Sequence, residues 1–194
     1  MYGAIGSRCP LCGRDGCYNK RKPYWRYAIE IDPFKKEKIP IARFACRKTR
    51  RTFSLLPIQL IPYHQYTIRS IMAMIEQVLS FESQGYSGCE AAVKHDETDS
   101  AITPFLVWCW LKMVVKGLRR VHWLLSVQYD LRGVQSGQGR RGLMEEAVGY
   151  QRAIAAGGRL GWPDKLEGLP SAHLQATGYF FYGSPSQQRL SRGR

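Results

Sequence analysis

Hydrophobic and polar residues alternate in two stretches near the amino end of the chain. These stretches cover residues 24–31 and 38–46, and the polar residues 32–38 between them are typical of a turn. A third short strand is expected at residues 51–56. The front of the chain is therefore predicted to form a small β module.

A helical pattern replaces the alternation after prolines 57 and 62, which interrupt any continuous helix in that segment. We place a domain boundary there. Thr67 is positioned to cap the helix that follows. The apolar residues of that helix recur at three- and four-residue spacing, as on a buried face: Ile68, Ile71, Met72, Ile75, Val78 and Leu79.

Two further helices are predicted in the middle of the chain. A short one begins near Ser87 and is followed by the polar residues 96–100. A longer one, capped by Ser100 or Thr103, runs through residues 104–120. This order, in which a long helix is followed by a brief helix, a turn and a further helix, is that of a helix-turn-helix. Such a motif can set one helix in the major groove of DNA.

The last third of the chain has a weaker pattern. Residues 132–142 have the composition of a flexible linker, and residues 143–156 predict one helix that Gly157 and Gly158 end. We expect the remaining residues to be irregular. Together these patterns predict an α+β chain in three parts. The parts are a β module at residues 1–57, a helical module at residues 64–125, and a linker, helix and tail at residues 126–194.

The net charge of +14 is concentrated at the front of the chain. Residues 1–56 hold fourteen Lys or Arg against four Asp or Glu, whereas residues 57–125 are balanced and residues 126–194 carry a smaller excess. A concentrated positive field attracts polyanions, because neutralised phosphates release condensed counterions. Nucleic acid is the expected partner. A membrane is not, because the basic segment lacks the amphipathic helix that membrane binding uses.

No leader or membrane-spanning segment is expected. The start of the chain lacks the charged, apolar and small-residue order of a signal peptide, and the longest apolar run, residues 104–111, is too short to cross a bilayer. A cytoplasmic protein is the expectation. Thiols stay reduced there, so closely spaced cysteines indicate metal ligation more than disulfides.

The cysteines predict half of a structural zinc site. Cys9 and Cys12 form a C-x2-C pair in the sequence CPLCG, a turn that points two thiolates at one ion. Cys46 ends a predicted strand and is well placed as a third ligand. Cys17 is the nearest candidate for the fourth ligand and His64 the second, and neither has a spacing that compels the choice. The alternative is that these are ordinary thiols, with Cys46 buried as a small hydrophobe.

The segments CPLCGRDGCYNKRKPYWRY and IPIARFACRKTRRTFSLLP resemble the N-terminal zinc ribbon of bacterial insertion-sequence transposases and their accessory proteins. The resemblance covers about residues 8–56. It implies that Cys9, Cys12 and Cys46 are zinc ligands and that RRTF is the closing motif. Thr49 stands where this pattern has its fourth cysteine, and a neutral hydroxyl is a poor zinc ligand. Such families often place a helix-turn-helix next, so the resemblance implies a zinc-ribbon-like β module followed by a mainly helical module.

Basic residues are mixed with aromatic ones in the predicted β module, and more lysines follow on the helix at 104–120. Exposed rings can stack on unpaired bases, but we expect Trp25, Phe44 and Phe53 to fill the small core instead. A solvated polar face or a protein interface accounts for the helical lysines equally well. The candidate contacts to nucleic acid are Lys20, Arg21, Lys22, Arg26, Arg43, Arg47, Lys48, Arg50, Arg51, Lys112 and Lys116.

Enzymatic interpretations have less support. GQGRRG at residues 137–142 matches G-x-G-x-x-G, but a polar linker separates it from the preceding apolar stretch and too little chain follows for a doubly wound sheet. A transposase catalytic domain needs several metal-binding carboxylates, and the strands to carry them are not apparent. The four histidines show no spacing that pairs them with a nucleophile.

The sequence therefore predicts a non-enzymatic DNA-binding protein linked to a bacterial mobile element, with zinc as its cofactor. The alternative is an assembly subunit of a larger enzyme or ribonucleoprotein complex, which docks through its helices and contacts RNA through its basic module. Both hypotheses give nucleic acid as a partner, and the sequence alone does not separate DNA from RNA.

Overall fold

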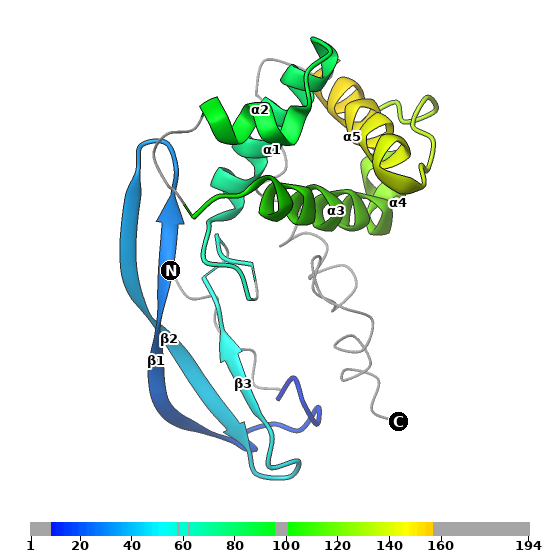
Figure 1. Cartoon of the computed structure of the whole chain (residues 1–194). Coiled ribbons are helices and arrows are strands. Elements are labelled where there is room, and N and C mark those ends of the chain that lie inside the picture. Colours follow the sequence, from blue (N-terminus) through cyan, green and yellow to red (C-terminus); the bar gives the residue numbers. More distant parts are fainter. Residues whose placement is uncertain (1–8, 58, 62, 96–100, 157–194) are drawn as a thin grey trace. The chain divides into compact units, whose positions relative to one another are not determined.

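The computed structural model describes residues 9–57, 59–61, 63–95 and 101–156 (Figure 1). The chain divides into two compact units, and the division falls between Thr67 and Ile68. In the described residues the first unit holds an antiparallel three-stranded sheet and the second holds the helices. The predicted α+β architecture, a β module followed by a helical part, is confirmed. Gly157, Gly158 and the predicted irregular tail lie outside the described residues.

The sheet of the β module has the strand order β1–β2–β3, with all neighbours antiparallel. Its strands are β1 (Tyr18–Glu30), β2 (Lys35–Cys46) and β3 (Thr52–Leu55). Figure 1 shows β1 and β2 as a long twisted hairpin and β3 as a short strand. The three strands confirm the predicted ones, but β1 and β2 begin earlier than the alternation indicates. The extra residues of β1 are polar, and pairing with β2 keeps them extended.

The register of β1 against β2 shifts once, between Arg21 and Tyr24. Three steps along β1 match two steps along β2 there, as in a β-bulge. Pro23 lies within this shift, and proline has no N–H to donate to the ladder. Because successive side chains of a strand alternate between the faces, one extra residue moves the later side chains of β1 to the opposite face. Trp25 therefore lies on the same face as Lys20.

A segment that follows β3 packs along β1 and completes the β module. The N–H of Ile29 donates to the carbonyl of Gln65 at 2.9 Å, and the N–H of Thr67 donates to the carbonyl of Ile29 at 3.0 Å. This segment also supplies part of the core of the module, which includes Ile29, Ile31, Ile41, Leu60, Ile61 and Tyr66. The residues around the two prolines thus belong with the sheet.

In its described residues the helical unit contains the three helices that the periodicity predicts, the predicted later helix, and one short helix that the pattern does not show. Thr103 caps α3 as expected, because its hydroxyl accepts the N–H of Leu106 at 3.2 Å and Pro104 follows in the first turn. None of the described helices combines the length and apolar content needed to cross a bilayer. The helices are α1 (Ile68–Ser83), α2 (Gly88–His95), α3 (Pro104–Arg120), α4 (His122–Leu125) and α5 (Gly139–Ala156).

Helix α3 is the core helix of this unit. It packs against α1, α2 and α5, and its buried residues are Val107, Trp110, Leu111, Val114, Val115, Gly117 and Leu118. Most of the surface of α3 is thus used for packing, and its exposed side is narrow.

Eight residues separate the end of α2 from the start of α3, whereas a helix-turn-helix usually has three or four. The connection between α2 and α3 is therefore longer than the turn of a usual helix-turn-helix.

A buried ion pair joins α3 to α5. The carboxylate of Glu146, only 2% exposed, accepts the Nε–H of Arg119 at 2.8 Å and the N–H of Gly137 at 2.9 Å. Arg119 also donates to the carbonyl of Gly137 at 2.6 Å. A side chain at Gly137 would collide with the backbone of Gly142. Because Gly137 and Gly142 have no side chains, the loop that contains Gly137 can lie against the start of α5. The hydrogen bonds of Gly137 with Arg119 and Glu146 hold the loop there.

Candidate metal centre and basic surface

Two of the four clustered cysteines lie on a turn ahead of the sheet. The N–H of Gly13 donates to the carbonyl of Cys9 at 2.8 Å, and the N–H of Cys9 donates to the carbonyl of Arg14 at 2.9 Å. Gly13 has a φ of 71°, a left-handed conformation that glycine adopts without a steric penalty. The sequence CPLCG thus folds into a tight turn that holds Cys9 and Cys12.

The strand register brings the other two cysteines together. Cys17 directly precedes β1 and Cys46 ends β2, and Tyr18 is paired with Cys46. The N–H of Arg47 donates to the carbonyl of Cys17 at 2.9 Å. The Sγ atoms of all four cysteines lie within 4.8 Å of one another. Cys17 therefore completes the set, and His64 is not a member of this cluster in the described part of the chain.

The cluster fits a zinc ion. Four thiolates are the donor set of a closed structural zinc site, in which Zn–S bonds of about 2.3 Å place the sulfur atoms about 3.8 Å apart. The Sγ atoms of Cys17 and Cys46 are 3.8 Å apart. Those of Cys12 and Cys17 are 3.0 Å apart and would need to separate by less than about 1 Å. Cys9 and Cys46 are each 1% exposed, so water is largely kept from two of the donors.

Thr49 contacts the cluster without being a ligand. Its backbone N–H donates to Sγ of Cys46 at 3.4 Å. Hydrogen bonds from the hydroxyl and the N–H of Thr49 lower the pKa of Cys46 to about 6, whereas a hydrogen bond to Cys12 and burial raise the pKa of Cys17. The residue at the place of the expected fourth cysteine thus stabilises the thiolate of a neighbouring ligand.

Replacing Thr49 by valine is expected to leave the chain with about one zinc ion. The ligand set is complete without Thr49, and the backbone N–H remains. Without the hydroxyl beside Cys46, the thiolate is less stabilised, and the zinc affinity is expected to fall by no more than about tenfold. Elemental analysis gives the stoichiometry, and competition with a chelator gives the affinity. A variant purified without metal would show instead that Thr49 is a ligand.

Three arginines form a row on one face of the sheet, which we call the arginine row: Arg21, Arg43 and Arg47. Arg21 and Arg43 are directly opposite each other in the β1–β2 register. The guanidinium of Arg47 donates to Oδ1 of Asn19 at 2.9 and 2.6 Å, and Asn19 lies two residues from Arg21 on the same face. Among the described residues the row has no carboxylate partner. Like charges opposite each other destabilise a sheet, so an anion bound to this row would stabilise it.

The turn between β2 and β3 extends this positive surface. It contains Lys48, Arg50 and Arg51, all exposed, and the N–H of Cys46 closes it on the carbonyl of Arg51 at 2.9 Å. The same turn carries Thr49 beside the cysteine cluster. Lys20 and Lys22 are also exposed, on β1. The structure thus brings most of the predicted basic contacts onto one end of the β module, next to the metal centre.

Arg26 lies apart from this surface. Its guanidinium is half-buried and donates to the backbone carbonyls of Ile61, at 2.9 Å, and His64. Burial lowers the pKa of Arg26, and burial together with the nearby Arg26 charge lowers the pKa of His64. These hydrogen bonds hold the segment after β3 against β1, so Arg26 does not belong to the exposed basic surface.

The expectation that Trp25 fills the core is wrong. Trp25 is 58% exposed, because the register shift turns it away from the buried side chain of Ile41. Phe44 and Phe53 are half-buried and stack at 5.4 Å between ring centroids, with Tyr18 edge-on to both. Tyr27, which is not among the predicted contacts, is 40% exposed and lies two residues from Trp25. Their spacing of two along a strand was the available signal.

The two predicted contacts on α3 lie in the helical unit. Lys112 is half-buried, with its Nζ 5.6 Å from the ring centroid of Trp108, and Lys116 is exposed. Arg140 lies 5.8 Å from the same ring. Lys112 and Arg140 lie near one ring and Lys116 lies elsewhere on α3, so these cations do not form a row like the arginines of the sheet.

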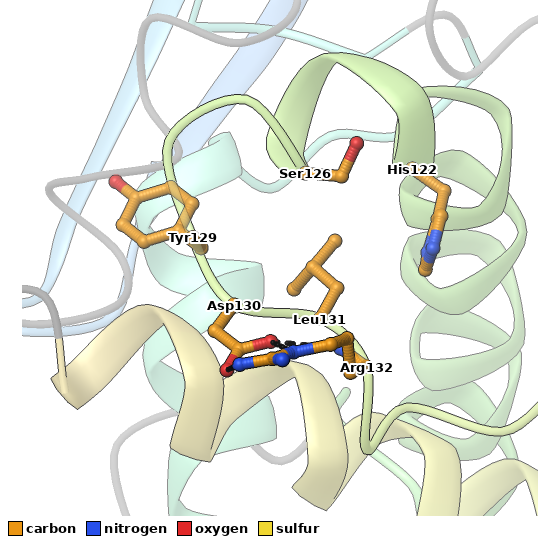
Figure 2. A pocket seen from close by; sticks show the side chains of 6 residues that line it. All are labelled: His122, Ser126, Tyr129, Asp130, Leu131 and Arg132. Carbon is orange, nitrogen blue, oxygen red and sulfur yellow. Dashed lines mark hydrogen bonds and ion pairs between the residues drawn. The ribbon is translucent and has the colours of Figure 1, made fainter.

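A hollow in the helical unit contains hydroxyl, imidazole and carboxylate groups, which Figure 2 shows. The side chains of Ser126, His122 and Asp130 in this hollow make other contacts. Ser126 donates to the carbonyl of Trp123 at 2.8 Å, His122 is bonded through Nδ1 to the hydroxyl of Tyr150 at 2.9 Å, and Asp130 is paired with Arg132 at 2.7 Å. The side chains of Ser126, His122 and Asp130 are thus not arranged as a nucleophile with its base.

A family model for a domain of unknown function (DUF6431) matches residues 9–96. The match begins at the first cysteine of the cluster and takes in the β module, α1 and α2. All four cysteines and the whole arginine row lie within the matched segment. Comparisons with curated proteins and with solved structures found no match.

Proposed function

We propose that this chain binds nucleic acid, with DNA as the favoured target, through the arginine row and the adjoining turn. The observation that carries this proposal is the pairing of Arg21 directly opposite Arg43, where neither has a carboxylate partner in the described part of the chain. A protein that places two like charges side by side loses stability unless a ligand neutralises them. Phosphates spaced along a backbone are the ligands that a row of guanidinium groups fits, because each group offers paired donors.

The metal centre supports this role by fixing the turn that carries the charges. Lys48, Arg50 and Arg51 lie between Cys46, a ligand, and the start of β3. A closed zinc site restrains this turn, so the basic side chains lose less freedom when they bind. Contacts of this kind position a protein on the phosphate backbone and do not read base sequence.

The resemblance to transposase zinc ribbons supports DNA as the target and a link to a bacterial mobile element. The role is binding and not catalysis. RNA, contacted by a subunit of a ribonucleoprotein complex, is the other outcome that the binding experiment distinguishes. Comparing duplex DNA, single strands and structured RNA at two salt concentrations identifies the preferred partner.

Replacing Arg50 and Arg51 together by glutamine is expected to weaken binding to duplex DNA by roughly 10–100-fold at about 0.1 M salt. If each arginine meets one phosphate, the slope of log affinity against log salt becomes shallower by about 1.8. The loss is expected to be similar for unrelated DNA sequences, because phosphates carry no sequence information. Fluorescence anisotropy over a salt series measures both quantities.

The matched control removes two arginines that already have carboxylate partners. Arg132 is paired with Asp130 at 2.7 Å and Arg141 with Glu145 at 2.9 Å, and both are exposed in the helical unit. Replacing both by glutamine changes the net charge by the same amount and is expected to leave the salt slope nearly unchanged. Equal effects of the two double variants would show that only overall charge matters, and the assignment to the sheet would be wrong.

A further inference from the structure

We propose that the outer half of the β1–β2 hairpin is a stacking site for unpaired bases, formed by Trp25, Tyr27, Lys36 and Lys38. We call these four residues the aromatic–lysine patch. The proposal deepens the proposed function by adding single-stranded nucleic acid as a ligand class. It involves other residues than the arginine row and can therefore fail independently.

The strand register places the four residues on one face of the hairpin. Tyr27 is paired with Lys38, Trp25 with Pro40, and Ile29 with Lys36, so these side chains share a face by alternation. Lys36 Nζ lies 4.9 Å from the ring centroid of Tyr27, and Lys38 Nζ lies 6.0 Å from it. Arg43 occupies an alternate position of β2 and is paired with Arg21, so the arginine row lies on the opposite face.

The rings are left in water by the described part of the fold. Trp25 is 58% exposed and Tyr27 is 40% exposed, although both are large enough to contribute substantially to a core. Positions two apart on a strand are separated by about 6.7 Å, roughly twice the 3.4 Å spacing of stacked bases. The ring of Trp25 can therefore receive one base of an extended strand, and the next base reaches Tyr27 when the ammonium groups of Lys36 and Lys38, which lie over that ring, turn to its phosphate.

The charges on the patch select the kind of partner. Lys36 and Lys38 have no carboxylate partner among the described residues, while Glu37 between them is paired with Lys35 at 2.8 Å. A nucleotide has an aromatic face and an adjacent phosphate, which match an exposed ring with an ammonium group beside it. Sequence-independent proteins that bind single strands combine these same two features, a cationic surface and rings on which bases stack.

The test compares Trp25→Ala with Trp25→Phe in the full-length, zinc-loaded protein. Stacking contributes about 1–3 kcal/mol per base. The alanine variant is therefore expected to bind a labelled oligothymidine of about twelve nucleotides roughly 5–150-fold more weakly than the unmodified protein does. The phenylalanine variant keeps a ring and is expected to lose much less. Affinity for duplex DNA of the same length stays within about twofold in both, because paired bases do not reach the rings. An oligouridine of equal length shows whether RNA strands bind as well.

A second variant tests the patch without touching a ring. Replacing Lys36 and Lys38 by glutamine is expected to make the salt slope for the oligothymidine shallower by about 1.4, given about 0.7 per phosphate on a single strand. Zinc content and thermal unfolding establish that each variant is folded.

The outcomes separate this proposal from the proposed function. If the unmodified protein binds duplex DNA but Trp25→Ala binds the single strand as well as Trp25→Phe does, the stacking site is overturned while the arginine row stands. An equal loss for single strands and duplex in Trp25→Ala also overturns it. Binding of neither ligand by the unmodified protein refutes both proposals.

Discussion

Replacing Cys17 by serine is expected to abolish zinc binding at physiological metal concentrations and to unfold the β module. The apparent free energy of zinc binding in small structural sites is about 10–16 kcal/mol, which exceeds what a core of this size supplies. The described core of the module consists of only a few large side chains, among them Ile29, Ile41 and Ile61. Elemental analysis measures the zinc, and the dispersion of amide signals in an NMR spectrum reports whether β1 and β2 are formed.

Cys109→Ser provides the control for this experiment. Cys109 is a half-buried cysteine on α3, outside the cluster, and its serine variant is expected to keep about one zinc ion per chain and the spectrum of the β module. Cys46→Ser is expected to behave like Cys17→Ser. If Cys17→Ser retained zinc at unchanged affinity, three cysteines and a group outside the cluster would hold the ion, and the assignment of Cys17 would be wrong.

The metal centre shows why a ligand set is difficult to complete from sequence. Cys9 and Cys12 are recognisable because their spacing alone defines a turn that points both thiolates at one ion. Cys17 and Cys46 are far apart in sequence, and only the pairing of Tyr18 with Cys46 brings their thiols together. No motif spacing encodes that register. The choice between Cys17 and His64 could therefore be made only with the sheet in view.

The exposed tryptophan illustrates the same limitation. The alternation of Trp25, Tyr27 and Ile29 correctly places three side chains on one face of β1, yet it does not say which part of that face is covered. The bulge at Pro23 and the segment after β3 decide this, because the segment packs beside Ile29 at one end of the strand. Coverage by a distant segment is a tertiary effect that a local pattern does not contain.

The helices were easier to predict because their signals are local. The face of α1 follows from apolar spacing, and α3 begins directly after its capping residue, Thr103. The contact between α3 and α5 was not predicted. Arg119 and Glu146 are far apart in sequence, and nothing in their spacing marks them as partners. Gly137 of the polar linker forms hydrogen bonds with both side chains, and these bonds help to fix the linker.

Replacing Glu146 by alanine is expected to lower the free energy of unfolding of the helical unit by about 3 kcal/mol. Removing one member of a buried ion pair leaves its partner uncompensated, at a cost of about 3–5 kcal/mol. The lower end applies because the Arg119 side chain is 35% exposed and regains some hydration. The N–H of Gly137 also loses its acceptor. Urea unfolding followed by helical circular dichroism measures the change.

Glu145→Ala is the matched control, because Glu145 is the neighbouring residue on the same helix. Its partner, Arg141, lies one turn away, and both side chains are mostly exposed. An exposed pair of this kind contributes about 0.3–0.5 kcal/mol. Replacing both Arg119 and Glu146, by methionine and leucine, is expected to cost less than Glu146→Ala, because no charge is then left buried. If Glu145→Ala and Glu146→Ala destabilised the unit equally, the buried pair would not be what holds α5 and its preceding loop against α3.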